Sequence, residues 1–161
     1  MYRTEGIVLK KLDVGEADTL YRIYTHDYGL IRALAQGIRK EEAKLRGHLE
    51  LLSLSGVRFV VGRRGEKLIA ASLVRHWPRM RAREHTIRLA GEIAREVDAQ
   101  CFPGEKDESV WDLLSGTFAA VDREDFSEEE VDPFLADFRN RFRAALGYGA
   151  SKEEEIENLS Q

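Results

Sequence analysis

Residues 5–40 read EGIVLKKLDVGEADTLYRIYTHDYGLIRALAQGIRK, and this stretch decides the fold of the N-terminal half. Three segments in it mix β-branched and aromatic residues with polar ones, as half-buried strands do: residues 6–11, 19–25 and 30–36. Gly15 and Asp18 delimit the first turn, and Asp27 and Gly29 supply the residues that a short hairpin loop needs. The sequence therefore predicts three strands joined by two tight turns.

A basic segment and two more strands complete the N-terminal pattern. Gly37 ends the third strand, and residues 38–47 (IRKEEAKLRG) have the polarity of a solvated loop or a short helix. Residues 57–61 and 67–74 then have the pattern of two strands around a hairpin turn. Five strands with one longer connection, between the third and the fourth, is the element count of an OB-type barrel. The pattern alone leaves other five-stranded barrels open.

Helical periodicity replaces the strand pattern after Pro78. The spacing predicts three helices, at residues 80–101, 109–121 and 133–146. Their apolar faces comprise Ile87, Ala90, Ile93, Ala94, Val97 and Cys101, then Val110, Trp111, Leu114, Phe118 and Val121, and finally Phe134, Leu135, Phe138, Phe142 and Leu146. We expect an α+β protein with an all-β OB domain at 1–78, an all-α domain at 79–150 and an acidic tail at 151–161.

Capping residues mark the ends of the second and third helices. Asp107 or Ser109 is expected to cap the start of the second helix. Asp132 precedes a proline at the first position of the third helix, where a missing amide hydrogen costs nothing. Gly147 is a natural stop for that helix.

Composition restricts the class of protein. Hydrophobic residues make up 43% of the 161 residues, which is enough to bury a core. The sequence has no run of 18 or more apolar residues, and its N-terminus opens directly into a strand. We therefore expect no membrane span, no signal peptide and a cytoplasmic location. Cys101 is the one cysteine, so we expect a small core residue and neither a disulfide nor a zinc ligand.

The net charge of −4 is divided unequally along the chain. Residues 1–80 hold 15 Lys and Arg against 9 Asp and Glu, whereas residues 81–161 hold 10 against 20. A phosphate backbone senses the local field, because screening limits its range to about 8–10 Å. The basic half is therefore compatible with nucleic acid. The alternative is that both halves have ordinary solvated surfaces.

Nine cations form the candidate DNA-binding track. They come from the third strand and its loop and from the last two strands: Arg32, Arg39, Lys40, Lys44, Arg46, Arg58, Arg63, Arg64 and Lys67. We expect barrel closure to bring the two groups to one face, where they contact phosphates. The acidic residues Glu41, Glu42 and Glu66 lie between these cations, which is the pattern of an ordinary solvated surface.

Aromatic residues are the usual companions of such a track, because bases stack on them. The candidates are Tyr21, Tyr24, Tyr28 and Phe59. At least one of Tyr21 and Tyr24 is expected in the core, because both lie within one strand. Tyr28 is favoured for stacking because it lies at a turn.

Patterns for catalysis and metal binding are absent from the sequence. The four histidines show no ligand spacing, no serine lies in a GxSxG motif, and residues 62–65 (GRRG) lack the length of a phosphate loop. Glu128, Glu129 and Glu130 are consecutive, and consecutive carboxylates at a helix start point apart. We therefore expect no enzyme, no cofactor and no metal site.

The N-terminal half resembles the first domain of the recombination mediators of the RecO family. The matching elements are residues 5–9 (EGIVL), residues 15–18 (GEAD), Tyr24-Thr25, Gly29, Ala35-x-Gly37-x-Arg39 and a later apolar strand, up to about Ser72. The resemblance implies the OB fold for this domain. Many relatives have a lysine where this chain has Gln36, so one cation is missing from the expected DNA face.

The C-terminal half resembles the helical domain of the same family more weakly. Phe138-Arg139 and Leu146-Gly147-Tyr148-Gly149 are similar to the motif that ends a helix in that domain. In most members further helices follow, often with a four-cysteine zinc site. This chain ends close to the motif, so the resemblance implies a short form of the family.

The resemblance also implies partners and an activity. These are binding of single- and double-stranded DNA, strand annealing, and cooperation with RecR so that RecA can displace the single-strand DNA-binding protein (SSB). The SSB tail ends acidic and apolar, and four arginines lie on apolar-lined helices where they can receive it: Arg88, Arg95, Arg139 and Arg143. The alternative function is an OB-fold interaction adaptor without DNA binding, and a hydrolase ranks third.

Overall fold

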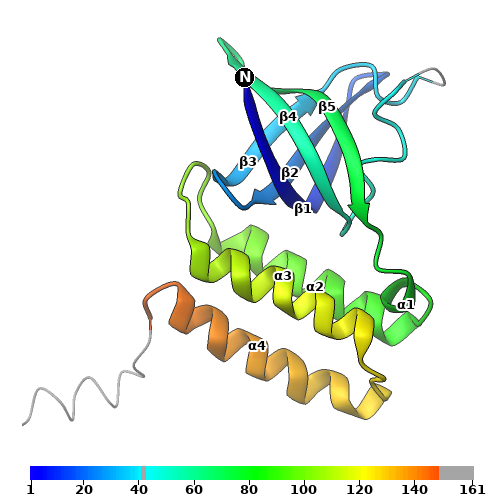
Figure 1. Ribbon diagram of the computed structural model, residues 1–161, viewed down its shortest axis with the longest axis vertical. Coiled ribbons are helices and arrows are strands. Elements are labelled where there is room, and N and C mark those ends of the chain that lie inside the picture. The colour runs from blue at the N-terminus through cyan, green and yellow to red at the C-terminus, as the bar shows by residue number, and fades with distance from the viewer. Residues whose placement is uncertain (41–42, 149–161) are drawn as a thin grey trace, which may run out of the picture.

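The longest strand, β1 (Tyr2–Val14), belongs to both sides of a barrel. Its first half pairs antiparallel with β4 (Leu54–Gly62), and its second half pairs antiparallel with β2 (Asp18–Thr25). Strand β2 forms a hairpin with β3 (Gly29–Ala35), and β4 forms one with β5 (Gly65–Arg75). This computed structural model describes residues 1–40 and 43–148 (Figure 1). The two hairpins are thus joined through β1.

A short parallel pairing closes the barrel. Ala33 and Leu34 of β3 pair with Glu66 and Lys67 of β5, which gives the closed order β1-β2-β3-β5-β4. This is the five-stranded Greek-key order of an OB-fold. The predicted OB barrel followed by helices is therefore confirmed. Strands β1 and β4 begin several residues earlier than their sequence patterns.

Inward-facing side chains of alternate residues fill the barrel. The buried set comprises Val8, Tyr21, Ile23, Ile31, Ala33, Ala35, Ile38, Leu49, Val57, Phe59 and Leu68. Two of these, Ile38 and Leu49, come from the long β3–β4 loop, so this loop closes one end of the barrel.

The helices form two layers on one side of the barrel. Their bounds are α1 Pro78–Arg81, α2 Glu84–Gln100, α3 Glu108–Arg123, the short 3₁₀ helix η1 Glu128–Glu130, and α4 Val131–Ala145. Figure 1 shows α2 and α3 against the barrel, with α4 on their far side. None of the helices in the described residues combines the length and the apolar character of a membrane span.

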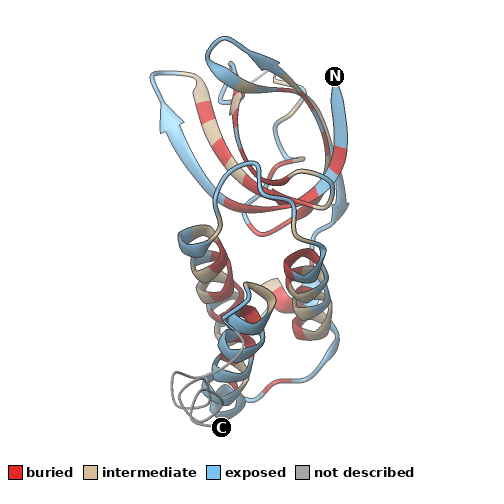
Figure 2. Ribbon diagram, turned by 90° about the vertical axis from the view of Figure 1, so that its left-hand side faces the viewer, coloured by how far each residue is buried: buried red, intermediate tan, exposed pale blue. Residues whose placement is uncertain are grey.

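One hydrophobic core joins the barrel to the helices. Ile7, Tyr24 and Leu30 point outward from the barrel and pack in the same buried cluster as the faces of α2, α3 and α4. Figure 2 shows buried residues of the barrel and of the helices where the two parts face each other. The Tyr24 hydroxyl donates to the carbonyl oxygen of Asp107 at 3.2 Å. The barrel and the helices therefore pack against each other through a shared core.

The chain passes from barrel to helices at Trp77, whose φ of +60° is unusual for a large residue. Its side chain is only 2% exposed, and its indole N–H donates to the carbonyl oxygen of Leu52 at 3.0 Å. The ring also packs edge-on against Phe118 of α3, with 6.0 Å between centroids. These contacts hold the left-handed turn in place.

The loop between α2 and α3 docks on the start of β3. The amide of Gly104 donates to the carbonyl oxygen of Leu30 at 3.0 Å, next to a bridge between Leu30 and Pro103. Gly29 has φ +65°, and a Cβ there would lie 2.1 Å from the carbonyl oxygen of Glu105. A glycine is therefore required at this contact.

The prediction of one continuous helix at residues 80–101 was wrong. The helix is broken between α1 and α2, where Arg83 is extended with φ −121°. The Arg83 guanidinium donates to the carbonyl oxygens of Val121 and Glu124 at the end of α3, both at 3.1 Å. The Asp122 carboxylate accepts hydrogen bonds from the amides of Arg79 and Met80 in the first turn of α1. These tertiary hydrogen bonds outweigh the helical pattern.

The predicted start of the last helix was also wrong. Helix α4 begins at Val131 and continues directly from η1, whose start is fixed by a capping box between Ser127 and Glu130. Asp132 therefore lies in the first turn and makes no cap. The glutamates of η1 are exposed, as expected. The cap of α3 by Asp107 and the stop of α4 at Gly147 are confirmed.

Candidate nucleic-acid interface

Three cations lie in cross-strand register on the outer face of β1, β2 and β3. The hairpin turn after Thr25 pairs Arg22 with Arg32, and Arg22 also pairs with Lys10. The guanidinium of Arg22 forms a salt bridge with Asp98 of α2, so the helices neutralise the central cation. Arg32 and Lys10 are exposed on either side of it.

An apolar row runs beside these cations. Leu12, Leu20 and Leu34 are aligned across β1, β2 and β3, and Leu34 pairs in turn with Lys67 of β5. Leu12 is 44% exposed, so the row is open to solvent at its β1 end. A surface with cations beside apolar side chains can hold phosphates and cover bases at the same time.

Arg39 holds the β3–β4 loop against the turn between β1 and β2. Its amide donates to the carbonyl oxygen of Ala17 at 3.0 Å, and its guanidinium lies 3.5 Å from the Asp13 carboxylate. The same guanidinium also donates to the carbonyl oxygen of Gly15. Arg39 is therefore largely occupied with structural contacts, which its position in the sequence does not reveal.

The other cations of this loop, Lys40, Lys44 and Arg46, are exposed. Arg46 lines a cavity of about 580 Å³ at the end of the barrel, together with Lys11 and Tyr21. Burial raises the pKa of the Tyr21 hydroxyl, and the charge of Asp13 raises it further. The loop and the barrel end thus carry four exposed cations within one region.

The remaining predicted cations are distributed over three places. Arg63 and Arg64 are exposed at the tip of the β4–β5 hairpin, at the upper left in Figure 1, whereas the β3–β4 loop is at the upper right. Lys67 links the hairpin to the Arg32 side of the barrel through the β3–β5 pairing. Arg58 lies on the outer face of β4, where it pairs with Arg3 of β1. Contact of these residues with DNA stays a prediction.

The aromatic candidates are mostly part of the core. Tyr21, Tyr24 and Phe59 are buried, in agreement with the expectation that at least one of the two strand tyrosines is a core residue. Tyr28 is half-buried and packs edge-on against Tyr2 and Phe59, with centroids 5.2 and 5.6 Å away. Tyr2 is the most exposed ring of this group, at 41%. Stacking on bases is thus open to Tyr2 and in part to Tyr28.

Metal and thiol chemistry find no support among residues 1–40 and 43–148. In these ranges no group of three or more His, Cys, Asp or Glu residues is placed to hold a metal ion. Cys101 packs against the shared core. Burial raises the pKa of its thiol to about 11, and the charges of Asp107, Glu105 and Asp98 add to that effect. A thiol of this kind is a weak nucleophile at neutral pH.

Comparison with known proteins places this barrel in a family. Residues 1–75 match the family model described as Recombination protein O N terminal. The chain is 33% identical over 151 residues to the DNA repair protein RecO of Pelotomaculum thermopropionicum and 30% identical over 148 residues to that of Roseiflexus sp.. The chain belongs to the RecO family.

The RecO relatives are longer than this chain. The alignments cover 92% of the chain but 56% of the Pelotomaculum protein and 50% of the Roseiflexus protein. The DNA repair protein RecO of Gloeothece citriformis is 43% identical over 77 residues, which cover 48% of this chain and 27% of that protein. Identity is thus higher over a segment about as long as the barrel than over the longer alignments.

The sequence reasoning missed four residues of the RecO barrel surface: Tyr2, Arg3, Lys10 and Lys11. Their positions follow from the register of β1, which is longer than its sequence pattern. One signal was available for Lys10. The turn at residues 26–28 fixes the pairing of Arg22 with Arg32, and a matching cation on the preceding strand continues that row.

Proposed function

We propose that the chain binds single-stranded DNA through its barrel and acts as a recombination mediator in DNA repair. The observation that carries this proposal is the outer face of β1, β2 and β3, where exposed Lys10 and Arg32 lie beside the apolar row that ends at Lys67. OB-folds bind oligonucleotides on the corresponding β2–β3 face. The exposed loop residues Lys40 and Lys44 extend the positive surface beyond this face.

The same arrangement supports a role without covalent chemistry. Annealing of two complementary strands requires that the charge of both backbones is neutralised while the bases stay free to pair. Cations supply the neutralisation, and no step needs a nucleophile or a general base. We infer that the chain anneals strands, also binds double-stranded DNA, and works in the cytoplasm with RecR to give RecA access to SSB-coated DNA.

A groove between α3 and α4 is the best candidate for the SSB tail. It has a volume of about 410 Å³, and its apolar lining includes Leu113, Phe134 and Phe138. Arg141 also lines it, in an ion pair with Asp137, and Asp112 is a second carboxylate of the lining. The apolar side chains of the tail peptide suit this groove, and its carboxylates must replace Asp137 as the partner of the Arg141 guanidinium. Of the four arginines named from the sequence, three are in ion pairs, and Arg143 has no such pair among the described residues.

The experiment that tests the proposal is a salt titration of DNA affinity. A labelled oligothymidylate is titrated with the full chain by fluorescence anisotropy at several salt concentrations. If four to six cations contact phosphates, log affinity falls with log salt with a slope of about −3 to −4, from about −0.7 per phosphate. Absence of binding at low salt would contradict the proposal and favour the interaction adaptor.

The tail site is tested with a peptide. Titration of a labelled SSB tail peptide is expected to show saturable binding that Leu113→Glu abolishes, since this change puts a like charge into the groove. Binding that is equal in the parent and in Leu113→Glu would place the tail elsewhere. DNA affinity should be unchanged in this variant, because Leu113 lies on α3 and away from the barrel face.

A further inference from the structure

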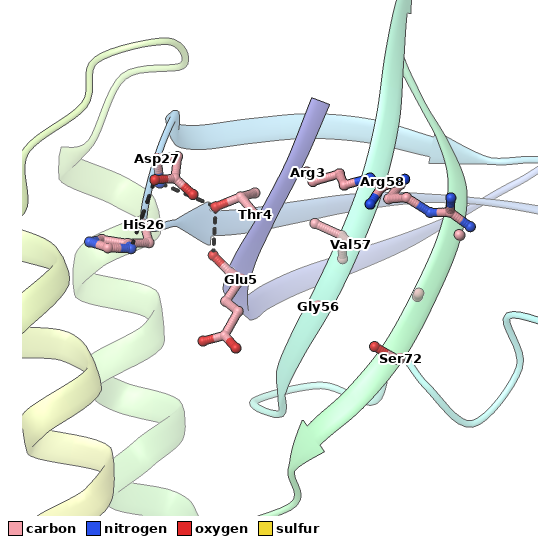
Figure 3. Close-up of a pocket in the computed structure, with 11 residues that line it drawn as sticks. Arg3, Thr4, Glu5, His26, Asp27, Gly56, Val57, Arg58 and Ser72 are labelled. Carbon is pink, nitrogen blue, oxygen red and sulfur yellow. Dashed lines mark hydrogen bonds and ion pairs between the residues drawn. The ribbon is translucent and has the colours of Figure 1, made fainter. Parts of the chain in front are cut away.

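A second pocket lies on the outer face of β1, β4 and β5, and the function proposed above does not use it. Its volume is about 520 Å³. Figure 3 shows Arg3 and Arg58 at one end of this pocket, and His26 and Asp27 at the other. The first half of β1 provides Arg3, whereas Lys10 belongs to the second half, which pairs with β2 instead. The pocket is therefore separate from the β1–β2–β3 face.

The two arginines are directly opposite each other in the antiparallel ladder of β1 and β4. Like charges in this position repel and weaken the pairing of the strands. Within the described parts of the chain, neither guanidinium has a carboxylate within 4 Å, although eight other arginine ion pairs occur there. The repulsion between Arg3 and Arg58 is thus left without internal compensation.

The floor next to the arginines is made of small residues. Arg58 pairs with Ala70 of β5, and Gly56 lies between Glu5 on β1 and Ser72 on β5. A Cβ on Gly56 would lie 3.1 Å from the Ser72 hydroxyl, so even a short side chain would fill the space. The floor therefore leaves room for a ligand over three strands.

The far end of the pocket limits what can bind. Glu5 lies two residues from Arg3 on the same strand face, and Asp27 is exposed beyond it. These carboxylates repel a continuous line of phosphates. A ligand that presents a single phosphate to the arginine end is favoured, and paired guanidinium groups match phosphate oxygens in a bidentate geometry.

We propose that Arg3 and Arg58 form a second phosphate-binding site, which takes a phosphate of the second DNA strand during annealing. This inference rests on the proposed function, because it assumes that the first strand is bound on the β1–β2–β3 face. The first DNA strand then lies on the β1–β2–β3 face and the second at the pocket of β1, β4 and β5. The barrel can therefore bind both DNA backbones while their phosphates stay apart. The phosphate is either internal to the second strand or at its 5′ end.

The test compares the variant Arg3→Gln/Arg58→Gln with the parent and with a control, Lys106→Gln/Arg123→Gln. The control removes two exposed cations from the helical half, so the net charge is the same. We expect the first variant to anneal complementary oligonucleotides at least tenfold more slowly than the control. Its affinity for one labelled strand should fall less than threefold, and the salt slope of its annealing rate should be smaller by about 0.7, for the one phosphate that is no longer bound.

Strand chemistry separates the two sources of the phosphate. Annealing is measured with second strands that carry a 5′ phosphate or a 5′ hydroxyl. A defect of the variant with both strands assigns an internal phosphate, and a defect with the phosphorylated strand alone assigns a terminal one. Annealing by Arg3→Gln/Arg58→Gln at the rate of the control would overturn the proposal.

Two further measurements keep the result interpretable. Gly56→Leu fills the floor and leaves both arginines in place, so it should reproduce the annealing defect if the double variant fails to fold. Tripolyphosphate should raise the melting temperature of the parent but not of Arg3→Gln/Arg58→Gln. If the parent binds no DNA, the proposed function is wrong. The phosphate site is then tested by tripolyphosphate alone: an equal effect on the parent and on Arg3→Gln/Arg58→Gln would contradict it.

Discussion

Arg22 of β2 and Asp98 of α2 form a salt bridge across the boundary between barrel and helices. The guanidinium also donates to the main-chain carbonyl oxygen of Asp98 at 3.3 Å, so one residue of α2 holds it at two points. The two side chains are only 20% and 18% exposed. The middle cation of the strand row is therefore used for holding the helices and is not available to a ligand.

This pair predicts the effect of Asp98→Ala. Loss of a sheltered partner leaves the Arg22 charge unpaired, which should lower the free energy of unfolding by about 1–3 kcal/mol. Glu92→Ala is the matched control, because it breaks the exposed pair with Arg95, and exposed pairs contribute little. Thermal melts of the two variants give the comparison. Equal melting temperatures would show that the Arg22 contact adds no stability.

Charge reversal in the β3–β4 loop should separate DNA binding from stability. Lys40→Glu/Lys44→Glu/Arg46→Glu should weaken binding of an oligothymidylate at least tenfold and reduce its salt slope by about 2, for three phosphates. The melting temperature should hardly change, since these side chains are exposed. Lys106→Glu/Arg123→Glu/Arg95→Glu on the helical half is the charge control, because it also reverses three exposed cations. If the triple variant binds and anneals DNA like the parent, the DNA-binding track does not include this loop.

Arg39→Glu should behave differently from its neighbours. Arg39 contacts Asp13 and the carbonyl oxygen of Gly15, so the reversal places two carboxylates together and releases the loop from the β1–β2 turn. We expect a lower melting temperature in addition to weaker DNA binding. A variant that melts like the parent would mean that these contacts do not stabilise the fold.

Two glycines with the same backbone conformation provide a matched pair. Gly29 and Gly15 have φ +65° and +62°, but a Cβ would meet the Glu105 carbonyl oxygen only at Gly29. Gly15→Ala should cost about 1–2 kcal/mol for the left-handed conformation alone. Gly29→Ala should cost clearly more, since the α2–α3 loop must move away. Denaturant unfolding measures both, and equal losses would contradict the close contact.

Residues 1–78 are proposed as a domain, and expression of this fragment tests the proposal. We expect a β-type circular dichroism spectrum and a cooperative melt. The melting temperature should be lower than that of the full chain, because Ile7, Tyr24 and Leu30 lose their contacts with the helices. A helical or unfolded spectrum would contradict the boundary at Pro78.

Alkaline pH should weaken the fold through Cys101. Burial raises the pKa of this thiol from 9.0 to about 11, so the folded state favours the neutral form. The resulting stability is fully present below pH 9 and is lost as the pH rises through 11. The parent should therefore lose more stability than Cys101→Ala between pH 8 and pH 11 in denaturant titrations. A constant difference between them would contradict the raised pKa.

The sequence was sufficient for the elements whose signals are local. The turns at Gly15 and Gly29 and the cap at Asp107 are set by neighbouring residues, so the strands and α3 were found near their true positions. The break after α1 was missed because Arg83 bonds to carbonyl oxygens at the end of α3. Such a partner is distant in the sequence and leaves no periodic signal.

The candidate site was predictable in its composition and less so in its arrangement. The basic character of the loop follows from counting charges, but the contacts of Arg39 depend on how the loop folds back on the β1–β2 turn. The pairing of Arg3 with Arg58 depends on the register of two strands that are more than fifty residues apart along the chain. Neither the fold-back nor this register can be derived from local patterns.

Both tryptophans of the chain lie where the barrel meets the helices. Trp77 is enclosed at the junction, and Trp111 stacks on His26 with 5.4 Å between ring centroids. The tryptophan fluorescence of the protein therefore reports this interface, because no tryptophan lies in the cationic loops. A change in emission when DNA is added would measure a movement of the helices against the barrel, without any attached dye.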